Sequence, residues 1–218
     1  MYELALFPLN TVLFPGMPLK LHIFEERYKL MINRCYDQQR PFGVVLIAEG
    51  QEALGPLAQP FSVGTTAHIS QLQRLPFGRM NILAIGGDRF RIHELKHDQP
   101  YLVGLVEDIP MPQITAETLQ KQGRSLRPLL ERYLRILEQA QQVEFDASQI
   151  PTDPTNLTQL AVFILQTDMH RKQSLLESET PHGFIHDLIT LYRSEIALLE
   201  IMSAPPHEDD AMGPFSAN

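Results

Sequence analysis

The sequence predicts an α+β fold in which strands fill the first half of the chain and helices fill the second. Up to Asp108, apolar residues come in short runs separated by Pro, Gly and Asn, which is typical of strands joined by turns. From Thr115 onward, apolar residues recur every three or four positions, the period of a helix with one buried face. Pro110 and Pro112 separate the two patterns, so we expect two subdomains, residues 1–112 and 113–203.

The first half contains six β-type runs and one helical segment. The segment Glu25–Tyr36 changes period, because its apolar residues fall at i, i+3, i+4 and i+7. The Gly86-Gly87 pair interrupts a long run and predicts a tight turn or a bulge. The expected strands are Leu4–Leu9, Leu19–Phe24, Phe42–Ile47, Val63–Leu72, Asn81–Leu95 and Leu102–Ile109.

The second half contains several amphipathic segments. One apolar face runs from Leu126 to Ala140, a second runs from Leu157 to Leu165, and a short third helix includes Ser174–Leu176. Thr180 and Pro181 suit the N-cap and first turn of a last helix. Residues 204–218 contain little apolar material to bury, so we expect a disordered tail there.

Charge and composition exclude several classes of protein. The net charge is −8, with 10 basic and 11 acidic residues in 1–110 and 8 basic and 15 acidic residues in 111–218. Neither half has the basic surplus of a nucleic-acid binder, so we expect no nucleic-acid partner. No apolar run approaches the ~20 residues of a membrane span, and no signal peptide is apparent. The single Cys35 fits a reducing compartment, and we expect a cytoplasmic protein.

Six segments of the first half form a distinctive set. In order, they are ALFPLNTVLFPG (5–16), PLKLHIFEERY (18–28), FGVVLI (42–47), VGTTAHISQ (63–71), GRMNILAIGGDRFRI (78–92) and YLVGLVED (101–108). Together they resemble the N-terminal, substrate-binding domain of the ATP-dependent Lon protease and its small stand-alone relatives. The resemblance implies a PUA-like, partly closed β-barrel with one helix, followed by an α-helical bundle.

The catalytic parts of a Lon protease are not found in the sequence. A phosphate-binding loop needs a Gly-Lys pair, and this chain has none. The peptidase uses a Ser–Lys pair, but the surroundings of Lys121 and Lys172 do not resemble the protease domain. We therefore expect a protein that is not an enzyme and that has no catalytic residues and no cofactor.

Other groupings of reactive residues have a simpler structural explanation. His182 and His186 have a spacing that can hold a metal, but no third ligand is evident, so we expect no metal site. Glu25 and Glu26 suit the first turn of a helix. Cys35 lies on an apolar helix face and is expected to be a core residue.

Two functions remain possible from the sequence. The first is a non-catalytic module that binds unfolded or partner proteins through apolar surface, although the same aromatic residues could simply fill a small barrel. Arg89 and Arg91 could bind an acidic partner, or could protect a sheet edge by their charge. The second is a small-molecule sensor or enzyme that uses a barrel pocket containing His22, His68, His93 or Asp88. The residues predicted to bind a partner are Phe7, Leu13, Phe14, Pro15, Phe24, Tyr28, Arg89 and Arg91. The sequence does not predict the oligomeric state.

Overall fold

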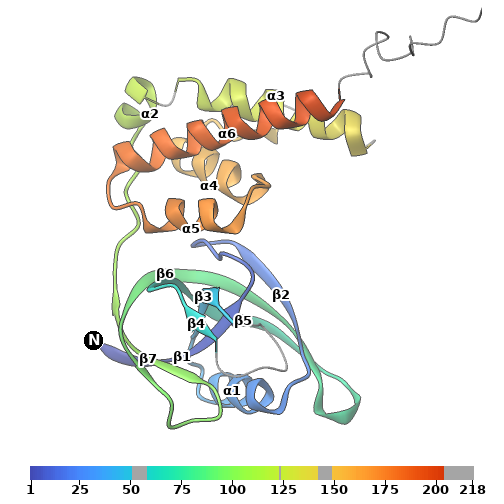
Figure 1. Cartoon of the computed structure of the whole chain (residues 1–218), viewed down its shortest axis with the longest axis vertical. Helices are drawn as coiled ribbons and strands as arrows, with labels where there is room; N and C mark the ends of the chain where they lie inside the picture. Colours follow the sequence, from blue (N-terminus) through green and yellow to red (C-terminus); the bar gives the residue numbers. More distant parts are fainter. Residues whose placement is uncertain (51–57, 123, 142–148, 204–218) are drawn as a thin grey trace, which may run out of the picture.

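The computed structural model describes residues 1–50, 58–122, 124–141 and 149–203 (Figure 1). Strands precede helices in the chain, and one helix, α1, interrupts the strands, which confirms the predicted α+β order. The strands are β1 (Tyr2–Leu9), β2 (Pro18–Ile23), β3 (Phe42–Glu49), β4 (Gln59–Pro60), β5 (Val63–Arg74), β6 (Met80–Lys96) and β7 (Leu102–Asp108). The helices are α1 (Glu26–Asp37), α2 (Ala116–Gln122), α3 (Leu126–Gln141), α4 (Pro154–Ile164), α5 (Met169–Glu177) and α6 (Pro181–Ser203).

The strand pairing closes into a ring. Strand β1 pairs antiparallel with β7 and parallel with β3, while β7–β6, β6–β5 and β5–β3 are antiparallel neighbours. Strand β4 adds to β3, and β2 adds to the first part of β6, from Met80 to Ile85. Because β6 is 17 residues long, its first part extends beyond the ring together with β5 and β2.

The Gly86-Gly87 pair produces a bulge within β6. The β5–β6 register shifts between Thr65 and Ala67, so that Gly87 and Asp88 lie opposite Thr66. A Cβ on Gly86 would lie 2.2 Å from the carbonyl oxygen of Phe14, so only glycine allows the β1–β2 loop to approach this closely. Two backbone hydrogen bonds hold the loop there, from Gly16 N to Gly86 O and from Gly86 N to Met17 O.

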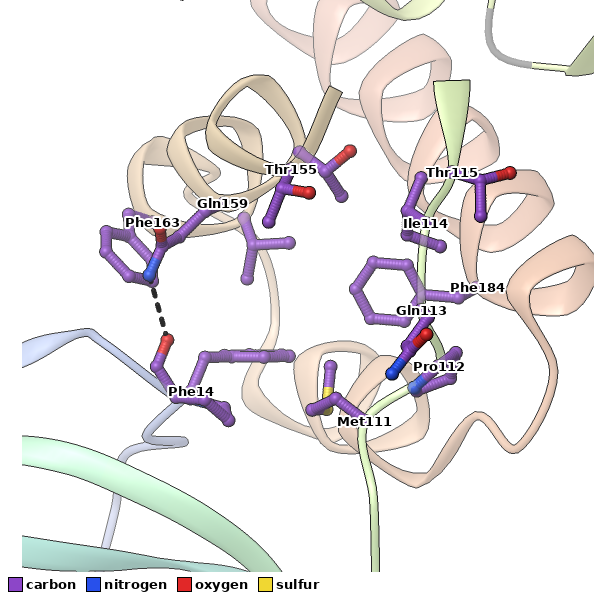
Figure 2. A pocket seen from close by; sticks show the side chains of 13 residues that line it. Phe14, Met111, Pro112, Gln113, Ile114, Thr115, Thr155, Gln159, Phe163 and Phe184 are labelled. Atoms are coloured by element: carbon purple, nitrogen blue, oxygen red, sulfur yellow. Dashed lines mark hydrogen bonds between the residues drawn. The ribbon is translucent and has the colours of Figure 1, made fainter. Parts of the chain in front are cut away.

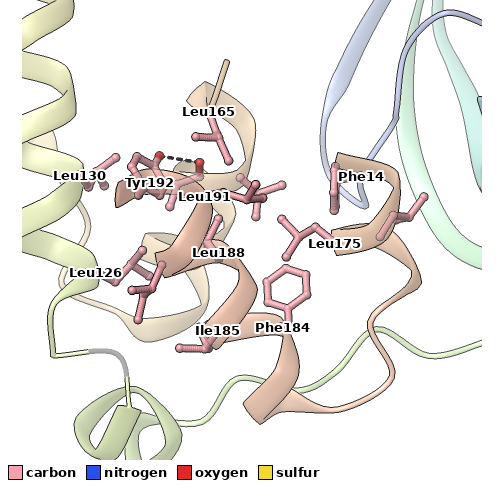
Figure 3. Close-up of a cluster of buried hydrophobic side chains, with 14 of the residues drawn as sticks. Phe14, Leu126, Leu130, Leu165, Leu175, Phe184, Ile185, Leu188, Leu191 and Tyr192 are labelled. Atoms are coloured by element: carbon pink, nitrogen blue, oxygen red, sulfur yellow. Dashed lines mark hydrogen bonds between the residues drawn. The ribbon is translucent and has the colours of Figure 1, made fainter. Parts of the chain in front are cut away.

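Different helices cover the two ends of the barrel. Helix α1 lies at one end, and its predicted apolar face, Tyr28, Met31, Ile32 and Cys35, is buried in the barrel core. Helices α4, α5 and α6 lie at the other end (Figure 1). The core of the helical half includes side chains from the barrel half, namely Val12, Phe14, Leu46 and Val63. Figure 3 shows Phe14 close to Leu175 of α5 and near Phe184 of α6. The two halves therefore share a hydrophobic core.

Side-chain caps fix where the later helices begin. The carboxylates of Asp153 and Asp168 accept hydrogen bonds from backbone N–H groups at the starts of α4 and α5. The Thr180 hydroxyl accepts a hydrogen bond from Gly183 N at 3.1 Å, which confirms Thr180 as the predicted N-cap of α6. Among the described residues, no helix has the length and apolar character needed to span a membrane. The predicted tail, 204–218, lies outside the described residues.

Candidate functional site

An apolar cavity of about 420 Å³ lies where the barrel meets the helices (Figure 2). Four segments distant in the sequence form its walls: the β1–β2 loop, the linker after β7, helix α4 and the first turn of α6. The lining residues are Phe14, Pro15, Met111, Pro112, Gln113, Ile114, Thr115, Thr155, Thr158, Gln159, Val162, Phe163 and Phe184.

The β1–β2 loop is attached firmly to helix α4 at this cavity. Gln159 donates a hydrogen bond from Nε2 to the carbonyl oxygen of Pro15 at 3.2 Å, shown as the dashed line in Figure 2. The turn that allows this contact requires Gly16, whose φ is +79° and whose hypothetical Cβ would lie 2.0 Å from Gln159 Nε2. Phe14 is only 2% exposed and packs into the helical core. This wall of the cavity is therefore fixed by both halves of the protein.

The linker is positioned by a buried arginine. Arg89, on β6, donates hydrogen bonds to the carbonyl oxygens of Pro110, Leu176 and Ser178, although its side chain is only 3% exposed. Burial lowers the pKa of the Arg89 guanidinium, and repulsion by Arg91 adds to this effect. Arg89 thus ties the end of α5 to the start of the linker, immediately before Met111 enters the cavity wall.

The lining chemistry suits apolar groups. None of the lining residues, all of them described, carries an ionisable side chain. Two of the three threonine hydroxyls are already hydrogen-bonded, because Thr158 donates to Pro154 O and Thr115 pairs with Thr118. The other polar side chains that line the cavity are Thr155, Gln113 and Gln159, and Gln159 already donates from Nε2 to Pro15 O. Such a site can bind an apolar side chain beside a peptide backbone, but it has no group suited to acid–base catalysis.

Comparisons with known proteins agree with this architecture. The family model of the ATP-dependent protease La (LON) substrate-binding domain matches residues 3–183. The chain belongs to the LON substrate-binding domain family. A Lon protease of Cytophaga hutchinsonii is 28% identical over 199 residues, covering 88% of this chain and 24% of that protein. The Lon protease of Escherichia coli is 24% identical over 200 residues, covering 91% of this chain and 26% of that protein. The chain thus spans about a quarter of the length of these relatives.

Solved structures of the LON family share the fold. The crystal structure of a Lon N-terminal domain protein from Xanthomonas campestris matches with a TM-score of 0.64 at 25% identity, covering 87% of this chain and 98% of that one. The N-terminal domain of a Mycobacterium avium complex Lon protease also has a TM-score of 0.64, at 18% identity, covering 88% of this chain and 98% of that one. The LON-type fold therefore extends over the barrel and most of the helical half.

The predicted binding residues do not gather at one place. Phe14 and Pro15 line the cavity, as described above. Phe7, Leu13 and Tyr28 are buried in the barrel core, where the rings of Phe7 and Tyr28 stack with centroids 4.1 Å apart. In this conformation these three side chains stabilise the barrel of the LON-type fold.

The other predicted residues lie in three different settings. Phe24 is 46% exposed beyond the end of β2, where its ring lies 6.1 Å from that of His22. Arg89 is buried beside the start of the linker, whereas the Arg91 side chain is 42% exposed and forms an ion pair with Glu179 at 2.9 Å. Their spacing by two places them on one face of β6, because the β5–β6 register is regular from Arg89 to Arg91. Hydrogen bonds to the end of α5 and to the linker bury Arg89, whereas Arg91 reaches only to Glu179.

Most of the cavity wall was not predicted from the sequence. The missed residues include Met111, Ile114, Thr155, Phe163 and Phe184. One signal was present, since apolar Met111 and Ile114 lie in a proline-bounded linker where polar residues are the usual choice. Phe163 and Phe184 look like ordinary core positions in the sequence, so only the tertiary structure distinguishes them.

The histidines considered for a small-molecule site are engaged in separate places. His22 Nδ1 lies 2.7 Å from Asn81 Oδ1, and His93 Nε2 lies 2.9 Å from Glu107 Oε2 on β7.

The two histidines considered for a metal, His182 and His186, stack with ring centroids 6.3 Å apart. Over the part of the chain that the structure describes, no three His, Cys, Asp or Glu residues are grouped as metal ligands.

Proposed function

We propose that this protein is a non-catalytic binding module that recognises exposed apolar segments of unfolded or partner proteins. The observation that carries the proposal is the apolar cavity formed by the β1–β2 loop, the linker and helices α4 and α6, with hydrogen bonds from Gln159 and Arg89 holding the loop and the linker. Membership of a substrate-binding domain family supports it. The lack of a Gly-Lys phosphate loop supports the non-catalytic part. We also infer that the barrel is PUA-like and that the helices form a bundle.

The size and chemistry of the cavity indicate how a segment would bind. A volume of about 420 Å³ accommodates one large apolar side chain together with part of the backbone that carries it. Complete burial of such a side chain contributes ~1.5–3 kcal/mol. Gln113 and Gln159 can pair with the amides of the bound backbone. One cavity of this kind binds weakly and without strict sequence preference, which suits a receptor for many unfolded segments.

A pair of matched variants tests this function. Ile114→Glu places a carboxylate in the cavity wall, and because Ile114 is only half-buried, the fold should survive the change. Ile201→Glu makes the same substitution on a residue of α6 that is 73% exposed and does not line the cavity. Binding of a labelled peptide with a central Phe-Leu pair, and of the same peptide with Ser at both positions, is measured by fluorescence anisotropy.

The expected result is preferential binding of the Phe-Leu peptide, with at least about tenfold weaker affinity for Ile114→Glu, because a carboxylate is costly to bury. Ile201→Glu should bind like the unmodified protein. Equal binding of the two peptides, or equal losses in both variants, would contradict the proposed site.

A further inference from the structure

The β5–β6 hairpin presents an exposed aromatic residue at its tip, at the end of the barrel that carries α1 and is remote from helices α2 to α6 (Figure 1). Phe77 lies in the short 3₁₀ turn Pro76–Gly78 and is 87% exposed. Its φ of +62° is in the left-handed region, which is a genuine outlier for a bulky side chain. An aromatic side chain that is both solvent-exposed and conformationally strained contributes nothing to the core, so this position calls for another explanation.

The tip is held in place by specific contacts. Leu75 N donates to Arg79 O at 2.8 Å, which closes the turn, and Lys29 Nζ donates to Phe77 O at 2.9 Å from helix α1. The Arg79 guanidinium lies 5.8 Å from the centroid of the Phe77 ring. The backbone that carries Phe77 is therefore held in place, so less loop ordering is required on binding than for a freely moving loop.

The surroundings of Phe77 are basic, although the protein is acidic. Residues 18–33 and 71–83 contain five basic and two acidic side chains, against a net charge of −8 for the chain. Both acids are already engaged, because Glu25 pairs with Arg27 and Glu26 pairs with Lys29. Among the residues that the structure describes, the basic side chains of this region without an ion-pair partner are Lys20, Arg74 and Arg79.

The outer face of the hairpin has no acidic side chain. His22 lies opposite Asn81 and Asn81 lies opposite Gln73, so these three side chains share one face, and a hydrogen-bonded row joins them. Lys20, two residues from His22, belongs to the same face, and an open depression of about 620 Å³ lies over these strands. We define the tip surface as Lys20, His22, Phe24, Phe77, Arg79 and Asn81.

We propose that the tip surface binds an acidic segment of a partner protein that also carries an apolar side chain. Phe77 and the half-exposed Phe24 contact the apolar side chain, while Lys20 and Arg79 pair with carboxylates. The local excess of three positive charges matches a segment with a few carboxylates. A nucleic acid carries a charge at every nucleotide, and the acidic remainder of the protein would repel most of them. This surface is separate from the apolar cavity, so a docked partner does not compete with a bound segment there.

The test uses a synthetic peptide of alternating Glu and Leu, a control peptide of alternating Lys and Leu, an oligouridylate and vesicles of phosphatidylcholine and phosphatidylglycerol. Binding to the full chain is measured by fluorescence anisotropy at low and high salt, with co-sedimentation for the vesicles. The acidic peptide should bind, more weakly at high salt, and the basic peptide should not.

Two variants locate the binding. Arg79→Glu should weaken acidic-peptide binding at least about tenfold, whereas Arg193→Glu, a charge reversal at an exposed position on α6, should not. Phe77→Gly should also weaken binding about tenfold, yet should keep or raise the melting temperature, because glycine accepts the left-handed conformation without strain. A residue with only a structural role would not lose binding while gaining stability.

Several outcomes overturn the proposal. The proposal is wrong if the acidic peptide does not bind, or if oligouridylate or the vesicles bind more strongly than the peptide. It is also wrong if Arg79→Glu and Arg193→Glu lose the same affinity, or if Phe77→Gly binds the peptide as the unmodified protein does. The cavity variant Ile114→Glu should retain acidic-peptide binding, so failure at the tip surface is distinguishable from failure of the proposed apolar cavity.

Discussion

Replacement of Arg89 by methionine should weaken the connection between the barrel and the helical half and lower the free energy of unfolding. Arg89 is the buried side chain on β6 that donates to Pro110 O, to Leu176 O and, at 2.8 Å, to Ser178 O. Methionine is shorter, but it replaces the aliphatic part of the arginine side chain, and it donates no hydrogen bond. The change therefore removes the polar connection between the barrel, the linker and the end of α5 while largely preserving the packing.

The size of the effect follows from opposing contributions. Hydrogen bonds from a charged group contribute ~1.5–3 kcal/mol each, and Arg89 makes three. A buried guanidinium also carries a desolvation cost of several kcal/mol, which methionine does not. Burial lowers the pKa of Arg89, which shows that this cost acts here. The difference leaves an expected loss of about 2–4 kcal/mol in the free energy of unfolding.

Urea unfolding followed by circular dichroism measures this loss. A loss of about 3 kcal/mol lowers the midpoint by about 1 M urea for an m-value near the upper end of the usual range. Arg91→Met is the matched control, because Arg91 is two residues away on the same strand, but its side chain is 42% exposed and its ion pair with Glu179 lies at the surface. Surface ion pairs contribute ~0–1 kcal/mol, so the control midpoint should move by less than about 0.4 M.

Binding gives a second measure of the same change. Since Arg89 holds Pro110 directly before the linker residues that line the cavity, Arg89→Met should also weaken binding of the Phe-Leu peptide under conditions where the variant is folded. The reasoning is refuted if Arg89→Met unfolds at the same urea concentration as the unmodified protein. It is equally refuted if Arg91→Met is destabilised as much.

Three further substitutions or reactions test other parts of the structure. Gly86→Ala should cost about 3 kcal/mol and lower the melting temperature by about 6–12 °C in calorimetry, because its Cβ would meet a backbone oxygen at 2.2 Å; a change below about 2 °C contradicts this. Burial raises the pKa of the Cys35 thiol to about 11, so Ellman's reagent should react slowly with the native protein at pH 8 and rapidly in urea; rapid native reaction would show that the thiol is accessible. Burial lowers the pKa of Lys172 in the folded protein. Below the unfolded pKa of ~10.4, the unfolded chain therefore binds the proton more tightly, and the charged lysine lowers the free energy of unfolding. Lys172→Met should therefore be more stable than the unmodified protein at pH 7, and this advantage in urea midpoint should shrink as the pH rises toward 10; an advantage independent of pH would argue against the assignment.

Most elements of the fold were predictable because each depends on a local pattern, although strand β4 and helix α2 were not predicted. The face formed by Tyr28, Met31, Ile32 and Cys35 is buried as its spacing predicts, since helical geometry alone brings these positions together. The N-cap at Thr180 also depends only on neighbouring residues. The bulge at Gly87 was one of two structures that the glycine pair allowed, and the pairing of β6 with β5 decides between them. Predictions of this kind use the sequence within a few residues, where the physical determinants lie.

The candidate site was not predictable in the same way, because its walls come from four separate segments. Phe7-Pro8 and Phe14-Pro15 are similar motifs in the sequence, yet Phe7 is buried in the barrel core and Phe14 in the helical core. Arg89 and Arg91 are equally similar, yet one is buried beneath the linker and the other is at the surface. Which part of a strand or loop the helices cover is a tertiary property, and nothing local to these residues encodes it.

Because one cavity residue also belongs to the shared core, the choice of variant decides whether binding can be measured separately from folding. Phe14 lines the cavity and belongs to the shared core, so its truncation would create a void costing about 3–5 kcal/mol as well as altering the site. Loss of binding in a Phe14 variant would therefore not separate recognition from folding. The half-buried linker residues are different, because Ile114 contacts the cavity at the edge of the core. If the linker rather than Phe14 governs which segments bind, relatives can change specificity at the linker without losing the contact that joins the barrel to the helices.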